Sequence, residues 1–331
     1  MSFDNLEDIK IERLNLAVLT VFTFLSLVFA AFIPFFGIIG VAMAPVPVTL
    51  LVVCNRVRDG IICAVVSCLV LIYPVYPDYM VAPAAAILII AVSFIYRNSI
   101  IKDKSKLYTT GILFLVFCGV FLLYILLVSV VNRGNYINDV FKNYNTYIDA
   151  ISSDRFISGY ASLLPVDRSQ LGALFKQVQS ILKFIPYIVP GILIVSFAFI
   201  SVINYITTYT VLKRYNIDIK PFSSFKEWEF PWYYCWGAIL GLVLVLIPYG
   251  GQSLNKIFDV IGFNLVVIFG LLYLVLGASV LWGILERFKV TFVWRIGIFI
   301  ILGLFFGLAI LILPFLGLID IWVNFRRLKR G

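Results

Sequence analysis

The chain has 331 residues, of which 62% are hydrophobic and only 13% are charged, and its mean hydropathy is +1.05. A soluble domain is about a quarter charged and about half apolar, because a folded globule needs a polar surface. The composition therefore excludes an ordinary soluble protein and predicts an all-α, polytopic membrane protein. The net charge of the chain is +9. In a membrane protein such an excess of basic residues is typical of loops that face an anionic lipid bilayer, so we expect no nucleic-acid partner.

The absence of histidine removes several classes of function. A histidine zinc site, a Ser-His or Cys-His catalytic pair and an imidazole proton relay all need this side chain. The five cysteines form no CxxC pair, and there is no Walker A run. We therefore expect a protein that is not an enzyme and that holds no cofactor and no metal.

Nine apolar segments approach the length needed to cross the hydrocarbon core, which takes about 20 helical residues. They are residues 14–33, 37–53, 60–77, 79–96, 108–131, 184–211, 232–248, 257–285 and 290–313. The residues before the first segment are acidic, so we do not expect a cleaved signal peptide.

The end of the chain allows other interpretations. Residues 290–325 would make two thin crossings if the chain turned near Gly303–Gly307. Alternatively, Pro314 ends the ninth span and residues 316–327 lie in the membrane interface.

Basic residues predict the orientation of the helical bundle. With a cytoplasmic N-terminus, the five inner segments hold fifteen Lys and Arg residues, and the short outer loops hold only Lys256. Tryptophans also gather near the predicted inner ends, as an interfacial aromatic belt would. We therefore predict a multi-pass protein with its N-terminus in the cytoplasm.

One long segment, 132–183, is not apolar enough to span a membrane. Apolar residues recur at helical spacing over 137–151 and over 171–181, and Gly159, Pro165 and Asp167 interrupt the pattern. We predict two amphipathic helices that form a lid over the outer face. A packing insertion without a ligand is the alternative.

Polar groups inside the spans are candidates for a ligand cavity, because almost every charge falls at a span boundary. Pro45 and Pro47 remove two helical N–H donors, so we expect an irregular segment of the kind that often lines a substrate cavity. The other polar groups would contact a small neutral or amphipathic ligand, or would fix the register of the helices. The candidates are Pro45, Pro47, Thr49, Ser201, Asn204, Thr208 and Asn264.

The segment from Lys220 to Trp236 is a candidate partner surface. Pro221 and Pro231 bracket it, and we expect a fixed cytoplasmic platform that acts as an interfacial anchor or docks another protein. The candidate partner or interface residues are Trp228, Trp232, Trp236, Asp320, Arg326 and Arg327. Elsewhere, the GxxxG pairs Gly237/Gly241 and Gly303/Gly307 predict close helix packing.

Several stretches together resemble one protein family. They are residues 45–47, 54–60, 209–214 and 221–231, and residues 316–327, which read Leu-Gly-Leu-Ile-Asp-Ile-Trp-Val-Asn-Phe-Arg-Arg. They resemble the YybS-like family of bacterial polytopic membrane proteins of unknown function. The resemblance implies a location in the bacterial cytoplasmic (inner) membrane. It also implies that the first six helices are similar to the substrate-binding S components of energy-coupling-factor transporters.

This resemblance implies a division of the chain and a function. We expect an S-component-like bundle at 1–211 that includes the 132–183 insertion, a cytoplasmic connector at 212–231, and about three further helices with a basic tail at 232–331. The expected function is small-molecule binding or transport, and the alternative is a non-transporting membrane scaffold or assembly factor with cytoplasmic protein partners. S components dock their ATPase module through an AxxxA pair, whereas here Ala17 is followed by Val21, so we do not expect that module.

The predicted topology can be tested by cysteine labelling in intact cells. We expect a membrane-impermeant thiol reagent to label the Ser153→Cys variant and not the Ser105→Cys variant, with the unsubstituted protein as background. Protection at position 153 together with external labelling at position 105 would contradict the orientation.

Overall fold

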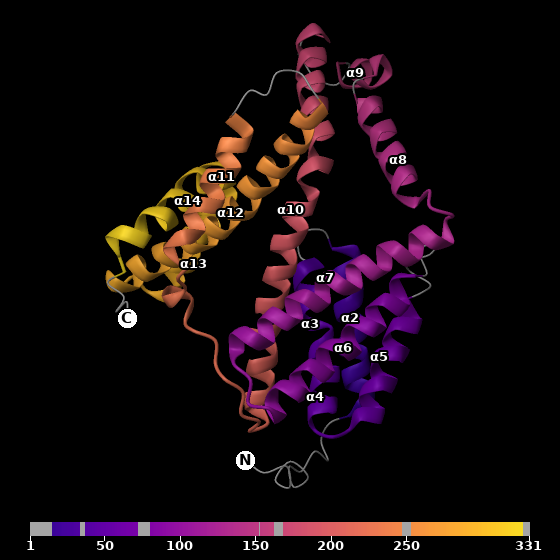
Figure 1. Cartoon of the computed structure of the whole chain (residues 1–331), viewed down its shortest axis with the longest axis vertical. Coiled ribbons are helices and arrows are strands. Elements are labelled where there is room, and N and C mark those ends of the chain that lie inside the picture. The colour runs from indigo at the N-terminus through magenta and orange to yellow at the C-terminus, as the bar shows by residue number, and fades with distance from the viewer. Residues whose placement is uncertain are drawn as a thin grey trace. The chain divides into compact units, whose positions relative to one another are not determined.

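The computed structural model describes residues 15–33, 37–71, 80–151, 153–161, 168–246 and 253–326 (Figure 1). Within these ranges the secondary structure is helical and contains no strand, so the all-α prediction is confirmed. The helices are α2 (Leu16–Phe32), α3 (Gly37–Met43), α4 (Pro45–Val53), α5 (Val57–Leu71), α6 (Val81–Ile101), α7 (Lys106–Val131), α8 (Tyr136–Ile151), α9 (Asp154–Ala161), α10 (Arg168–Arg214), α11 (Cys235–Leu246), α12 (Ser253–Arg287), α13 (Phe292–Leu304) and α14 (Phe306–Val323), with 3₁₀ turns η1 (Phe225–Glu227) and η2 (Trp232–Tyr234).

Five helical segments in the described ranges are long and apolar enough to cross a membrane. They are Val81–Ile101, Lys106–Val131, Ser169–Arg214, Ile257–Arg287 and Phe306–Val323. Four shorter apolar segments, Leu16–Phe32, Gly37–Val53, Trp232–Leu246 and Phe292–Leu304, accompany them. The multi-pass architecture is therefore present, and the count of nine crossings stays a prediction.

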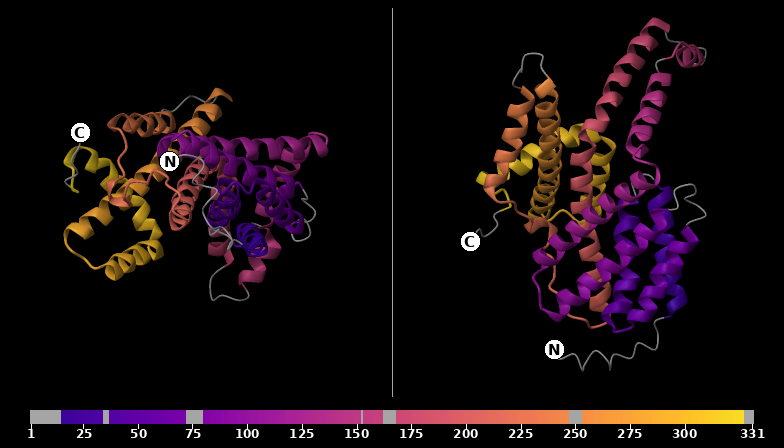
Figure 2. Two further views of the ribbon diagram at one scale, coloured as in Figure 1. Left: turned by 90° about the horizontal axis from the view of Figure 1, so that it is seen from below. Right: turned by 45° about the vertical axis from the view of Figure 1, so that its right-hand side comes forward.

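The chain forms two compact units. The first comprises residues up to Phe141 together with Ser196–Phe222, and the second comprises Lys142–Val195 together with the residues from Ser223 onward. In both views of Figure 2, helices α2 to α6 of the first unit gather into one bundle. The division predicted from the sequence, with an S-component-like part at 1–211, stays a prediction.

Helix α4 lies at the centre of the first unit. Every residue from Pro45 to Val53 is buried, and α2, α5 and α6 pack around the helix. A helix that is apolar on all sides is stable only when other helices surround it. The prediction of an irregular segment around Pro45 and Pro47 is wrong except at Ala44, where a single-residue turn separates α3 from α4. Pro45 and Pro47 fit the first turn of α4, because the amides of that turn lack partners within the helix.

The 132–183 segment differs from its prediction in how it ends. Its first amphipathic stretch forms α8, but its second stretch is not a separate helix, because α10 continues without a break from Arg168 to Arg214. Tyr144 donates a hydrogen bond to the carbonyl of Leu182 at 2.7 Å. That carbonyl would bond the amide of residue 186 in a regular helix, and Pro186 has no N–H. The α8 side chain thus satisfies a group that the proline leaves without a donor.

The predicted ninth span is two helices. α13 ends at Leu304 and α14 begins at Phe306, so the break falls within the Gly303–Gly307 stretch where the sequence allowed a turn. The alternative in which Pro314 ends the last span is wrong, because α14 continues through Pro314 to Val323.

Glycines allow α12 and α14 to approach closely at one crossing. A Cβ atom on Gly277 would lie 1.8 Å from the carbonyl oxygen of Leu313, and one on Gly317 would lie 2.6 Å from that of Tyr273. The predicted GxxxG packing holds for Gly237 and Gly241, which face α12 residues. It fails for Gly303 and Gly307, where nothing within 4 Å would meet an added Cβ.

A glycine substitution tests this crossing. We expect Gly277→Ala to lower the free energy of unfolding by about 1–3 kcal/mol, because the methyl group has no room against the α14 backbone. Gly270→Ala, on the same helix with nothing within 4 Å, is the matched control and should be neutral or stabilising by up to about 1 kcal/mol. Thermal unfolding in detergent measures both, and equal effects would contradict the close approach.

Candidate functional site

Three of the polar residues predicted to line a cavity in the first unit, Thr49, Ser201 and Asn204, form hydrogen bonds within the protein. Asn204 is fully buried; its amide nitrogen donates to the carbonyl of Ala42 at 2.7 Å, and its amide oxygen accepts from the Tyr96 hydroxyl at 2.9 Å. The hydroxyls of Thr49 and Ser93, both buried, lie 3.2 Å apart. These contacts join α3, α4, α6 and α10, so they fix the register of the helices.

The remaining candidates of the first unit are also interior. Ser201 donates to the carbonyl of Phe197 in its own helix at 2.7 Å, and Thr208 is fully buried. Pro45 and Pro47 lie inside α4, among residues that are all buried. The structure therefore places these residues in a packed interior, in contact with other helices.

Asn264 belongs to the second unit and completes the backbone hydrogen bonding of α10. Its amide nitrogen donates to the carbonyl of Tyr187 at 2.7 Å, and its amide oxygen accepts from the N–H of Gly191 at 2.6 Å. A regular α-helix would pair these two backbone groups directly. A Cβ atom on Gly191 would lie 2.9 Å from the same amide oxygen, so glycine is needed for the approach.

The predicted platform is a largely non-helical segment between α10 and α11. The indole N–H of Trp228 donates to the carbonyl of Ser223 at 3.2 Å, and the rings of Phe225 and Trp228 meet edge to face at 5.2 Å. The segment then enters α11 through η2, where Trp232 is 60% exposed, as is Trp236 in α11. One end of the segment is therefore tied down and the other presents aromatic rings.

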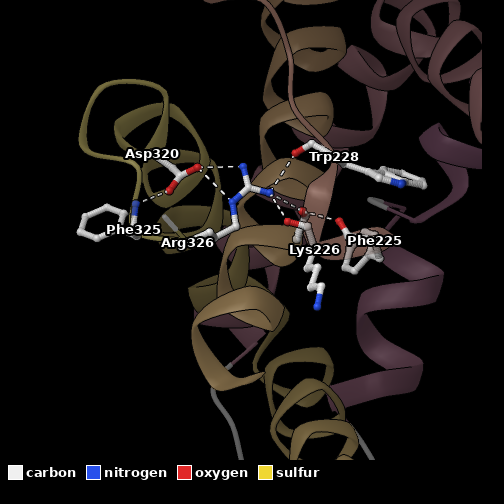
Figure 3. A network of polar contacts seen from close by, with 7 residues as sticks. Phe225, Lys226, Trp228, Asp320, Phe325 and Arg326 are labelled. Carbon is white, nitrogen blue, oxygen red and sulfur yellow. Dashed lines mark hydrogen bonds and ion pairs between the residues drawn. The ribbon is translucent and has the colours of Figure 1, made fainter. Parts of the chain in front are cut away.

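The end of α14 folds back on Asp320. Asn324 adopts a left-handed conformation (φ 50°, ψ 57°) and ends the helix, as Asn does more readily than most non-glycine residues. The turn directs the N–H of Phe325 to Asp320 Oδ1 at 2.7 Å (Figure 3). It also brings Arg326 Nη2 to Asp320 Oδ2 at 2.8 Å, with side chains that are only 2% and 1% exposed. The two predicted interface residues are thus a buried ion pair, and Arg327 lies outside the described residues.

Arg326 connects this ion pair to the platform. Its Nη1 donates to the backbone carbonyls of Lys226 and Trp228 at 2.7 and 3.0 Å (Figure 3). The same nitrogen lies 3.0 Å from the hydroxyl of Ser279 in α12, and that hydroxyl donates to the carbonyl of Phe225 at 2.6 Å. One guanidinium therefore holds α14, α12 and the 225–228 turn together. We call Asp320, Arg326, Ser279 and these carbonyls the arginine clamp.

The sequence reasoning missed two members of the clamp environment, Ser279 and Gly283. A Cβ atom on Gly283 would lie 2.9 Å from Cγ and Cδ of Arg326, so the glycine makes room for the arginine stem. Ser279, Gly283 and Glu286 recur at spacings of four and three residues on an apolar helix. That spacing places small and polar residues in a strip on one helix face, and this strip is the sequence feature that could have indicated the site.

An ion cluster ties the platform to the end of α12. Glu286 pairs with Lys226 through one carboxylate oxygen, and its other oxygen accepts from Arg295 at 3.1 Å. The guanidinium of Arg295 also lies 5.0 Å from the ring centre of Trp282. The hydrogen bond to Glu286 raises the pKa of Lys226 above its ordinary value.

A pocket of about 360 Å³ adjoins the clamp. Its charged lining comes from Glu229, Asp320 and Arg326. Its apolar lining is Phe230, Pro231, Trp232, Leu276 and Ile321. The pocket thus combines the predicted partner residues Trp232, Asp320 and Arg326 in one site. In the described ranges no group of three or more Cys, Asp and Glu side chains is arranged to hold a metal ion.

Comparison with known families identifies the chain. It belongs to the family described as predicted membrane protein (DUF2232), which matches residues 20–321. Neither a curated protein nor a solved structure matches the chain. Membership agrees with the apolar helices of this DUF2232 protein and identifies it as a membrane protein, while the YybS-like and S-component resemblances stay predictions.

Breaking the arginine clamp should lower the free energy of unfolding. Arg326→Met leaves the carboxylate of Asp320 buried without its partner, and we expect a loss of about 3–5 kcal/mol in unfolding free energy. The double variant Arg326→Met/Asp320→Asn should recover part of that loss, because it removes the uncompensated charge. Arg287→Met is the matched control: its exposed guanidinium donates to the carbonyl of Phe325, and its loss should cost less than about 1 kcal/mol.

Unfolding in detergent, monitored by tryptophan fluorescence, gives the free energy of unfolding of all three variants. An Arg326→Met variant as stable as the Arg287→Met control would show that the ion pair does not hold the unit together.

Proposed function

We propose that this DUF2232 protein is a non-transporting membrane scaffold or assembly factor that presents residues 225–236 to a cytoplasmic protein partner. The observation that carries the proposal is the arginine clamp, which holds the segment around the 3₁₀ turn η1 in one shape by means of a buried charge. Burial of an ion pair contributes little net stability but can select one conformation. A surface that is already ordered loses less entropy when it binds.

The aromatic residues that follow the clamped turn suit such a role. Trp232, Tyr233 and Trp236 are exposed, and tryptophan and tyrosine are enriched in the energetically important parts of protein interfaces. The same rings also suit the level of lipid headgroups. An interfacial anchor is therefore the competing interpretation, and the experiment must separate the two.

The packed interior of the first unit favours a scaffold over a small-molecule site there. Both ends of the Asn204 amide are bonded to protein groups, and α4 is buried along its whole length. A ligand between these helices would have to displace those contacts. The transport-related function predicted from the sequence therefore receives less support than its alternative.

Site-specific photo-crosslinking tests the proposal in cells. With a photoreactive residue at position 233, we expect one discrete protein adduct, whereas position 122 on α7, where Leu122 is 66% exposed, should give lipid adducts only. Ser279→Ala removes the hydroxyl that joins Arg326 to the Phe225 carbonyl and keeps the ion pair. It should lower the yield of the adduct severalfold without changing the amount of protein.

The matched control is Ser201→Ala, which removes a buried hydroxyl from the first unit. It should leave the adduct unchanged. Lipid adducts alone at position 233, or equal effects of the two serine variants, would favour the anchor and overturn the scaffold.

A further inference from the structure

The part of α8 from Lys142 onward and the first part of α10 form an antiparallel pair within the second unit (Figures 1 and 2). Asp149 of α8 pairs with Lys183 of α10 at 2.8 Å. We call the less exposed positions along this contact the seam, and they are Tyr144, Ile148, Phe175, Gln179 and Leu182. Asp149 and Lys183 each come one residue after a seam position, and they meet each other. Residues that follow the seam therefore share one side of the pair.

The other side of the pair is apolar and exposed. In each helix, the residue before a seam position points about 100° away from it, in the direction opposite to the residue that follows. Tyr147, Leu174, Val178 and Ile181 each precede a seam position, and they are 75%, 56%, 42% and 61% exposed. Because the helices are antiparallel, these positions lie on one side of the pair. We call these four residues the apolar face.

The apolar face lies outside the part of α10 that crosses the membrane. α10 has 47 residues and a length of about 70 Å, more than twice the hydrocarbon thickness of about 30 Å. Residues 184–212 carry no charge and suffice for the crossing, whereas Lys176 and Lys183 belong to the preceding turns. Since α10 is one continuous helix, these turns extend beyond the hydrocarbon. An apolar face that lipid does not cover is typical of a protein interaction surface.

The residues that border the apolar face fit a second copy of this chain. Asn143, Gln170 and Gln177 each stand four residues before a member of the face, so they are its neighbours along the helices, and all three are exposed. In a twofold interface a patch meets itself, so charges of one sign would repel each other. An amide both donates and accepts hydrogen bonds, so it can pair with its own copy. The charged pair Asp149–Lys183 lies on the other side.

The size of the apolar face is also sufficient for this occupant. The exposed parts of its four side chains amount to about 500 Å², so two copies would bury about 1,000 Å², the lower bound for a specific interface. Two copies in one membrane already share their orientation and depth. They therefore lose less translational and rotational freedom on association than two soluble proteins do.

We propose that the apolar face of one copy packs against the apolar face of a second copy and joins the two into a dimer. α8 and α10 of both copies then form a four-helix bundle outside the hydrocarbon, with its twofold axis along the membrane normal. This surface shares no residue with the docking segment 225–236, so either proposal can fail without the other.

Thiol crosslinking in native membranes tests the contact. Val178→Cys places a thiol on the apolar face, whereas Ser180→Cys places one at an exposed position on the opposite side of α10. With the unsubstituted protein as background, we expect a short bismaleimide to convert Val178→Cys, and not Ser180→Cys, into a product that contains two copies of the chain. No such product from Val178→Cys, equal products from both variants, or a product that contains a different protein would overturn the proposal.

Charge complementarity at one position separates a second copy from any other partner. Val178→Asp alone, or Val178→Lys alone, brings like charges together and should lower the association constant about tenfold or more. A mixture of the two variants should associate again, because opposite charges then meet. Energy transfer between donor-labelled and acceptor-labelled copies in liposomes measures the association.

Ser180→Asp is the matched control and should associate like the unsubstituted protein. Melting temperatures in detergent check that each variant is folded. Unchanged association of the single Val178 variants, or a mixture of folded variants that stays as monomeric as its components, would overturn the dimer.

Discussion

The second unit depends on the ion pair and the hydrogen bonds that the guanidinium of Arg326 makes. A single 3₁₀ turn supplies few backbone donors for its carbonyls, and lipid offers no hydrogen-bond donor. Arginine supplies five N–H groups in a fixed plane, so one side chain reaches carbonyls 98 and 100 residues earlier in the chain and a carboxylate six residues away. The carboxylate of Asp320 balances the charge, and this balance makes its burial tolerable.

The same physical requirement explains the polar residues of the spans. Asn264 joins the two backbone groups of α10 that lie beside Pro190, and Asn204 satisfies the carbonyl of Ala42 just before the α3–α4 turn. In each case an amide or guanidinium completes backbone hydrogen bonding where the helix is interrupted. Asn204 and Asn264 thus have a structural role in these spans, and the ligand cavity stays a prediction.

Much of the architecture follows from local sequence properties. Composition and apolar length predict the helical membrane fold, and Gly303 and Gly307 mark the place where α13 gives way to α14. The continuity of α10 was not predictable, because Pro186 and Pro190 show what a helix loses there and not which side chains of α8 and α12 replace it. The Gly277–Gly317 crossing escaped notice because these glycines lie on different helices and form no GxxxG pair.

The candidate site, like the fold, could be predicted from the sequence only in part. The sequence marks Trp228 and Trp232 as interface candidates. It also marks Asp320 and Arg326, whose spacing of six residues would place them on different faces of a continuous helix. Their burial depends on the left-handed turn at Asn324 and on the space beside Gly283, both of which appear only when α12 and α14 are packed. Long-range packing therefore decides whether these charges face water or the interior.

The chain order of the arginine clamp has a consequence for biosynthesis. Arg326 follows the carbonyl that it binds, that of Lys226, by 100 residues. During translation the 225–228 turn therefore emerges before α11 to α14 are made, and until then the carbonyls of Lys226 and Trp228 lack their hydrogen bonds to Arg326. The turn can form its hydrogen bonds to Arg326 only after residue 326 has left the ribosome. A nascent chain that stops before this arginine lacks these hydrogen bonds, so the contacts that hold the turn depend on synthesis past residue 326.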